Sequence, residues 1–235
     1  MVDEQVRLTE LIAAETRAFD LLDRVEELGF VAAGRTEREV EQDIYALAAQ
    51  EFGVQAHWHK RIVRAGLNTL AIAADNPEIR TIAEDDMVFV DIGPVFEDWE
   101  ADVGRSYAIG ADPRKQALCR DLLTQFDNVR AHFLADPQIT GAALYAFACE
   151  SAKAAGWQFG GKIAGHIVGE FPHARLPGPK QINYIRPENP EKLRNPDGLG
   201  QTRHWILEIH LVDPSGTFAG FYERLMLENA PALSA

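Results

Sequence analysis

Basic residues, cysteines and long apolar runs are all scarce in this sequence. Its 235 residues include 23 Lys and Arg against 36 Asp and Glu, a formal net charge of −13. This acidic excess disfavours nucleic acid or an anionic membrane as a partner. No apolar run approaches the roughly 18 residues of a membrane span, and the first residues include acids where a signal peptide would carry bases and then an apolar stretch. We therefore expect a cytoplasmic protein without nucleic-acid or membrane partners.

Only two cysteines, Cys119 and Cys149, are present. Each falls in a segment with helical apolar spacing, and neither has a neighbouring histidine or cysteine at metal-ligand spacing. The pattern favours two reduced, partly buried thiols over a disulfide or a nucleophile. The hydrophobic content of 46% is enough for a substantial core, so the chain is expected to be globular.

Apolar periodicity and capping signals predict four helices. Thr36 and Glu39 form a Thr-x-x-Glu capping box, and Asp112 followed by Pro113 combines an N-cap with proline at the first helical position. The expected helices cover 5–28, the segment after Thr36, 113–134, and a segment that starts near 140 and ends before 156.

Short apolar runs predict strands in two hairpins. The first pair is MVFVDI at 87–92 and VGRSYAIG at 103–110, separated by a polar segment. The second pair covers 205–213 and 218–228, joined by a turn at 213–216. Between the hairpins, the segment 171–200 is rich in Pro and Gly and should be a long irregular excursion, of a kind that is usually functional in compact domains.

Acidic residues interrupt the apolar strands of the first hairpin. Asp91 and Asp102 are unfavourable there for both β-propensity and burial. A tight turn centred on Phe96 and Glu97 would make them cross-strand neighbours, with Cβ atoms about 5 Å apart. Two carboxylates at that distance repel each other unless they are protonated or share a cation.

The second hairpin repeats the pattern with Glu208 and Glu223, placed nearly symmetrically about its turn. The four carboxylates of the two hairpins would neutralise two divalent ions. His166, in GGKIAGHIVGEFPH, offers a nitrogen ligand, and His173 follows seven positions later. Such a ligand set suits a pair of Mn, Co, Fe or Zn ions that share a bridging water.

These segments, in this order, resemble the pita-bread metallohydrolases, which include methionine aminopeptidase, aminopeptidase P, prolidase and creatinase. The resemblance runs through GRTEREVEQD, VDIGPVFEDWEADVGRSYAIG, GHIVGEFPH, LEIH and YERLMLE. It implies an α+β fold in which helices cover a curved antiparallel sheet. We expect one catalytic domain over 1–235, without a separate N-terminal domain.

The resemblance also implies roles for the ordered acids and histidines. Asp91 would bind one ion, Asp102 and Glu223 would bridge both, and His166 with Glu208 would complete the second ion's shell. Glu208 would also handle protons, while His173 would contact the substrate and stabilise the tetrahedral intermediate. The ions would activate a water and polarise the scissile carbonyl.

The sequence departs from the family pattern in two places. The peptidases carry a further histidine before the first aspartate, where this chain has Ala73; only an unusual path of the chain could bring His57 or His59 into the site. After His173, the family's Glu and nearby Pro are replaced by Ala174, Arg175 and Leu176. Contacts that an N-terminal domain makes in the longer relatives would come from the 171–200 excursion or a partner subunit.

The leading functional hypothesis is a dinuclear metal-dependent exopeptidase that acts on small peptides. The pair Gly104-Arg105 is similar to the Xaa-Pro branch, that is, prolidase and aminopeptidase P, although Arg105 could equally pair with a site carboxylate. A creatinase-like hydrolase of a non-peptide C–N bond is an alternative. In that part of the family the reaction needs no metal, so five intact ligands count against it.

A noncatalytic binding module is the remaining alternative, because pita-bread domains also serve as interaction platforms. Modules of this kind typically lose metal ligands, whereas all five are retained here. The chain is also expected to be able to form a homodimer.

Overall fold

The computed structural model describes residues 3–227. Its helices are α1 (Glu4–Glu27), α2 (Glu37–Phe52), α3 (Pro113–Ala135) and α4 (Gly141–Ala154), which confirms the helices expected from the sequence. The capping box of α2 is formed: the Glu39 N–H donates to the Thr36 hydroxyl, and the Thr36 N–H donates to the Glu39 carboxylate. Asp112 caps α3 by accepting from the backbone N–H groups of its first turn.

The strands form two antiparallel sheets. The larger sheet runs in the order β2 (Ile62–Ala65), β3 (Met87–Ile92), β6 (Val103–Ala108), β10 (Ala219–Leu225), β9 (His204–Val212) and β7 (Gln158–Phe159), and β8 (Gly165–Val168) also pairs with β9. The smaller sheet contains β1 (Ala56–His57), β4 (Pro94–Phe96) and β5 (Trp99–Glu100). The fold is therefore α+β, as predicted.

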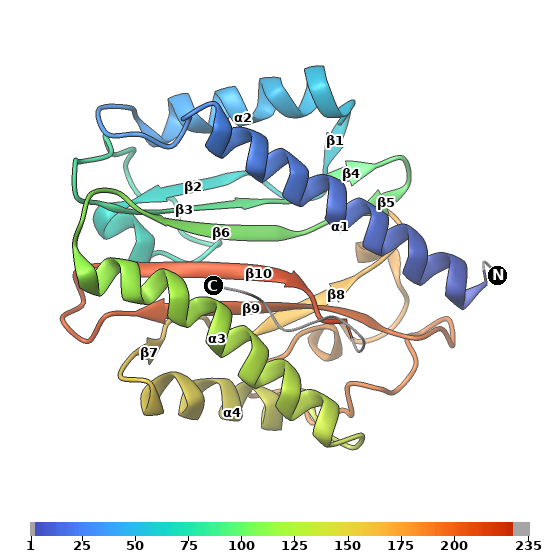
Figure 1. Ribbon diagram of the computed structural model, residues 1–235. Helices are drawn as coiled ribbons and strands as arrows, with labels where there is room; N and C mark the ends of the chain where they lie inside the picture. The colour runs from blue at the N-terminus through green and yellow to red at the C-terminus, as the bar shows by residue number, and fades with distance from the viewer. Residues whose placement is uncertain (1–2, 228–235) are drawn as a thin grey trace.

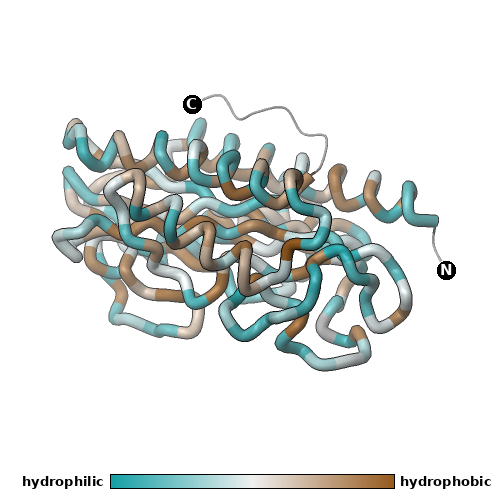
Figure 2. Tube along the Cα trace, turned by 90° about the horizontal axis from the view of Figure 1, so that it is seen from below, coloured by the Kyte–Doolittle hydropathy of each residue, from teal (hydrophilic) through white to brown (hydrophobic). Residues whose placement is uncertain are grey.

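The helices pack against one face of the larger sheet. Helices α1 and α2 cover its β2–β3–β6 half and α3 and α4 cover its β10–β9 half, so two core clusters lie side by side (Figure 1). Figure 2 shows long helices along one side of the molecule and irregular loops along the other. Core residues alternate along each strand, as Val88 and Val90 do in β3 and Leu207 and Ile209 do in β9. Because strand side chains alternate between faces, the residues between them project from the helix-free face.

The first hairpin differs from the predicted register. Its two-residue turn is Glu97–Asp98, one residue beyond the predicted centre, and Glu97 has a φ of 58°. As a result Asp91 pairs with Gly104, and Asp102 lies two residues further along as a diagonal neighbour. The two aspartates still share a face, because positions two apart on a strand project the same way.

The second hairpin, the irregular segment and the free thiols are confirmed, although β10 ends at Leu225 and position 228, where its strand was expected to end, lies outside the described residues. Gly216 donates its N–H to the Asp213 carbonyl at 2.8 Å, which closes the turn of the second hairpin. The segment 171–200 is irregular, with only the short 3-10 helices η2 (His173–Arg175) and η3 (Lys180–Asn183). Cys119 and Cys149 are free thiols of intermediate burial. Among residues 3–227, no helix has both the length and the apolar character needed to cross a bilayer.

Candidate metal centre

Three of the predicted carboxylates project from the helix-free face of neighbouring strands. Glu223 in β10 lies between Glu208 in β9 and Gly104 in β6, and Gly104 in turn pairs with Asp91 in β3. A Cβ at Gly104 would lie 2.8 Å from the Phe221 ring and 3.1 Å from the Glu223 side chain. The glycine therefore lets the carboxylates on either side of it approach each other.

His166 reaches the same group of carboxylates from β8. Its neighbour Gly165 has a φ of 143°, and a Cβ there would lie 2.0 Å from the Ile206 carbonyl, so only glycine allows β8 to approach β9 this closely. The Nε2 atom of His166 is 2.9 Å from Asp102 Oδ2 and 3.6 Å from Glu208 Oε1. All five residues predicted as ligands are thus brought together.

His59 also lies in this site, which the sequence analysis had made conditional on an unusual path of the chain. The path exists because β1 pairs with β4 of the first hairpin. The next residue, Trp58, donates its backbone N–H to Gly93 and its indole N–H to the Ala101 carbonyl, at 2.9 and 3.0 Å. His59 Nε2 consequently lies 3.1 Å from Asp102 Oδ1 and 3.5 Å from Asp91 Oδ1.

His57 has no place in the site. Its ring contacts Tyr45 of α2, with centroids 5.6 Å apart. Burial, followed by the nearby Arg61 charge, lowers the pKa of His57 to about 4. This histidine is therefore a neutral packing residue.

The pKa values of the site carboxylates depart from those of ordinary acids. Burial raises the pKa of Glu208 to about 8, with repulsion from Asp102 and Asp91 in the same direction, and burial raises that of Glu223 well above its usual value. Burial acts the same way on Asp102, but His59 and His166 outweigh it and lower the pKa of Asp102 to about 2. The protein alone cannot hold all these carboxylates ionised.

The candidate ligand atoms lie close together, and two of the carboxylate oxygens have no hydrogen bond from the described residues. Asp91 Oδ1 and Glu223 Oε1 are buried and accept no hydrogen bond from the described residues. Potential ligand atoms of Asp102, His166 and Glu223 all lie within 4.8 Å of one another, and so do those of His59, Asp91 and Asp102. Buried, unpaired carboxylate oxygens next to imidazole nitrogens fit divalent metal ions.

A cavity of about 590 Å³ opens onto these residues. One wall is apolar and includes Ile62, Phe89 and Phe221, which form a small cluster of their own on the helix-free face. Ala73 lines the cavity at the position where the family histidine was expected. A cavity of this size accommodates a small molecule such as a short peptide.

His173 lines the cavity, and its position depends on a residue that the sequence analysis missed. Glu100, 1% exposed, accepts the His173 backbone N–H at 3.0 Å and contacts Nδ1 of its ring at 2.5 Å. The alternation Glu100, Asp102, Gly104 was the available signal, because alternate residues of an extended segment project to the same side. Trp58 was missed too; its ring contacts those of His59, His166 and His173.

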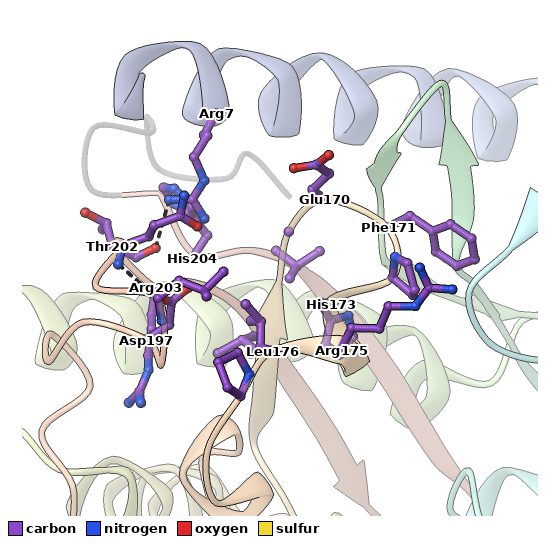
Figure 3. A pocket seen from close by; sticks show the side chains of 17 residues that line it. Arg7, Glu170, Phe171, His173, Arg175, Leu176, Asp197, Thr202, Arg203 and His204 are labelled. Carbon is purple, nitrogen blue, oxygen red and sulfur yellow. Dashed lines mark hydrogen bonds between the residues drawn. The ribbon is translucent and has the colours of Figure 1, made fainter. Parts of the chain in front are cut away.

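A second cavity of about 270 Å³ is lined in part by η2 and also reaches His173 (Figure 3). Arg175 and Leu176, which follow His173 closely in the chain, belong to its wall. Opposite them, Arg7 from α1 donates to the Thr202 carbonyl at 3.2 Å. The 171–200 excursion thus contributes lining residues to both cavities.

Arg105 has no contact with the candidate ligands, contrary to one of the two interpretations of the sequence. Its guanidinium pairs with Asp23 Oδ1 at 2.7 Å and Glu26 Oε2 at 3.3 Å, both on α1. The side chain points to the helix-covered face because Arg105 follows Gly104, whose position belongs to the site face.

Comparisons with known proteins agree with this geometry. The family model of metallopeptidase family M24 matches residues 9–198, and a comparison with curated protein sequences gave no significant match. Because the family model covers most of the chain, this protein belongs to metallopeptidase family M24. The matched range ends before Glu208 and Glu223, and the structure itself brings these two residues to the site.

Solved structures of the pita-bread type share the fold. X-Pro aminopeptidase from Thermotoga maritima aligns with 99% of this chain, with a TM-score of 0.71 and 19% sequence identity. Prolidase from Thermococcus sibiricus aligns with 98% of this chain, with a TM-score of 0.65 and 20% sequence identity. This chain spans only 64% and 63% of those two proteins. Methionine aminopeptidase from Thermotoga maritima has a TM-score of 0.69 and 17% sequence identity, and the alignment covers 96% of this chain and 94% of the aminopeptidase chain.

Proposed function

We propose that this protein is a dinuclear metal-dependent exopeptidase that hydrolyses small peptides of Xaa-Pro type. One observation carries the proposal. Four of the predicted ligands, Asp91, Asp102, His166 and Glu223, belong to two groups of closely spaced ligand atoms, and Glu208 lies 3.6 Å from His166. These residues line a cavity large enough for a dipeptide or tripeptide.

Asp102 belongs to both groups of ligand atoms, and Glu223 lies between Gly104 and Glu208 on neighbouring strands. In line with the family resemblance, we propose that both would contact the two ions. Asp91 would hold the first ion, and His166 with Glu208 would hold the second. Divalent ions bound in this way would lower the pKa of a water molecule and polarise a peptide carbonyl. The four carboxylates balance the charge of two such ions, which accounts for their burial in a site with few protein cations.

Glu208 is the ligand best placed to move a proton. Its side chain keeps 15% of its surface exposed, compared with 10% for Asp91 and 3% for Asp102. A carboxylate that borders the cavity can take a proton from the attacking water and pass it to the departing amine.

His173 is the chain's own donor for the substrate. Its Nδ1 is held by Glu100, so Nε2 is the free ring atom of a histidine that lines the cavity. We assign it to the carbonyl oxygen of the scissile bond. Because Nδ1–H donates to the Glu100 carboxylate, Nε2 has a proton to donate only in the imidazolium form, and in that form it would stabilise the developing charge.

The apolar wall supports the assignment of substrate class. Ile62, Phe89 and Phe221 line the cavity with an apolar surface beside the carboxylates, and a proline ring fits such a surface without an unpaired polar group. The relatives with similar folds include proteins described as a prolidase and an X-Pro aminopeptidase, but also a methionine aminopeptidase, whose substrate side chain is apolar as well.

The proposal is tested with metal-stripped protein reloaded with Mn²⁺, Co²⁺ or Zn²⁺. Release of free amino acids is measured on Xaa-Pro dipeptides, Met-Xaa peptides, dipeptides without proline, and creatine. We expect metal-dependent cleavage with the highest kcat/KM on Xaa-Pro substrates, and two bound ions per chain by elemental analysis.

The other outcomes each contradict part of the proposal. Preference for Met-Xaa would retain the exopeptidase and reject the Xaa-Pro assignment. Hydrolysis of creatine alone would move the chemistry to a non-peptide C–N bond. Neither bound metal nor cleavage of any substrate would reject an enzymatic function for this site and favour a binding module.

A further inference from the structure

We propose that His59 is a sixth metal ligand, which binds through Nε2 the same ion that Asp91 and Asp102 hold. The inference rests on the proposed dinuclear centre and adds to it a nitrogen ligand on the first ion. It concerns a residue that stands 14 positions before Ala73 in the sequence, where the family pattern expects its additional histidine.

The position of the ring meets the geometric requirement for a ligand. His59 Nε2 lies 3.1 Å from Asp102 Oδ1 and 3.5 Å from Asp91 Oδ1. The nearer Asp91 oxygen is the same buried atom that accepts no hydrogen bond from the described residues. An ion between these three atoms would satisfy that oxygen and separate the two acidic groups from each other.

His59 repeats the arrangement of His166, the ligand implied by the family resemblance. In each histidine Nδ1 contacts the backbone carbonyl of the following residue, at 2.6 Å from Lys60 O and 2.8 Å from Ile167 O. In each, Nε2 points to Asp102, with one imidazole at each carboxylate oxygen. Metal-binding histidines commonly donate their other N–H to a backbone carbonyl, which fixes the tautomer with its lone pair toward the metal.

The His59 ring occupies space that a side chain at position 93 would fill. A Cβ at Gly93 would lie 2.2 Å from His59 Cδ2 and 2.3 Å from Nε2, so the imidazole occupies the place of a missing side chain. Trp58 holds the segment through its two hydrogen bonds to the hairpin, and its ring lies 4.5 Å from the His59 ring between centroids. The imidazole is therefore held in place before any ion binds, as a ligand should be.

A second imidazole would change which ions the centre prefers. Nitrogen ligands suit Zn, Fe and Ni better than Mn, and a carboxylate-rich shell with a single histidine favours harder ions. With His59 and His166 bound to metal, two other histidines line the cavity. His210 Nε2 is 2.9 Å from the Thr69 carbonyl, so His173 would be the histidine left to face the substrate.

The first test is calorimetric titration of metal-stripped protein with Zn²⁺ and with Mn²⁺. We expect two ions in the wild-type protein and at least about 10-fold weaker binding of one of them in His59→Ala, since that is the smallest loss seen even for residues that only orient a ligand. Gly93→Ala should weaken the same ion, because the new methyl group displaces the ring. His57→Ala is the matched control on the same segment, and it should bind both ions normally.

A crystal structure of the zinc-loaded wild-type protein gives an answer that does not depend on how the variants fold. A bond of about 2.0–2.1 Å from His59 Nε2 to zinc is expected. A separation above about 3 Å, or two ions of unchanged affinity in a folded His59→Ala protein, would overturn the inference and leave the proposed dinuclear peptidase standing. A wild-type protein that binds no divalent ion would overturn both.

Discussion

The buried carboxylates of this protein differ in their hydrogen-bond partners, as a comparison of Glu37 with Asp91 and Glu223 shows. Glu37, at the start of α2 and 4% exposed, accepts hydrogen bonds from Ala65 N at 2.7 Å and from Arg80 N and Asn68 Nδ2 at 3.0 Å each. Asp91 and Glu223 are about as buried, yet each has an oxygen that accepts none from the described residues. Burial is the same in the two groups, and only the partners differ.

The comparison separates a structural acid from a functional one. A carboxylate surrounded by protein donors stabilises the fold, and its loss leaves those donors unpaired. A carboxylate that faces other carboxylates destabilises the metal-free protein and has its partner outside the chain. The following changes test this division, beginning with the largest expected effect.

Asp102→Asn removes the carboxylate that lies within hydrogen-bond distance of both His59 Nε2 and His166 Nε2. Metal-dependent kcat/KM on an Xaa-Pro dipeptide should fall at least about 100-fold, because the variant loses a ligand shared by both ions. The fold should survive, since asparagine has nearly the same shape. Bound metal is measured by elemental analysis in parallel. A variant with wild-type metal content and activity would show that this acid is not a ligand.

Glu37→Ala should lower the stability of the fold and leave metal binding unchanged. The change leaves the Ala65 and Arg80 N–H groups and the Asn68 amide without their acceptor, and we expect a loss of about 2–4 kcal/mol in the free energy of unfolding. Urea denaturation measures this loss. Metal stoichiometry at low temperature should equal that of the wild-type protein; a lost ion would show that the two groups are coupled.

The stability of the metal-free protein should decrease as the pH rises from 6.5 to 9. The folded-state pKa is raised to about 8 for Glu208, about 9 for His166 and about 10 for His59, against reference values of 4.5 for Glu and 6.5 for His. The folded state therefore binds more protons than the unfolded chain in this range, and stability is lost as the pH passes through the raised values.

We expect the Tm of the metal-free protein to drop by on the order of 5 °C over that range. Metal-loaded protein should not show the drop, because bound ions take the place of these protons. Differential scanning calorimetry of both forms at matched ionic strength is the measurement. A metal-free Tm that rises with pH would contradict the description of the site as a cluster of unbalanced acids.

Arg105→Gln should have the smallest effect. Its partners Asp23 and Glu26 lie on the surface of α1, with side chains 60% and 63% exposed, so the pair should contribute less than about 1 kcal/mol. Activity on Xaa-Pro peptides should stay within about twofold of the wild type. A loss of more than about 10-fold would mean that this arginine acts on the site despite its orientation.

The features predicted well from the sequence were those with local causes. The capping box at Thr36 and Glu39 and the proline after Asp112 act over a few residues, so their helices could be located directly. The predicted turn of the first hairpin was wrong by one residue. Glu97 adopts the left-handed backbone conformation there, which is unusual for residues other than glycine, asparagine and aspartate. The partners of Arg105 and His173 depend on packing between distant segments and could not be deduced from spacing.

The sequence by itself determined which side chains could form a metal centre, because strand alternation places Asp91, Glu208 and Glu223 on one face once the strands are identified. Tertiary structure decided which histidines meet them. His59 is 43 residues from Asp102 in the chain, and their contact requires the β1–β4 pairing and the space at Gly93. No local pattern encodes such a contact, since it depends on backbone pairing and on the absence of a side chain elsewhere in the fold.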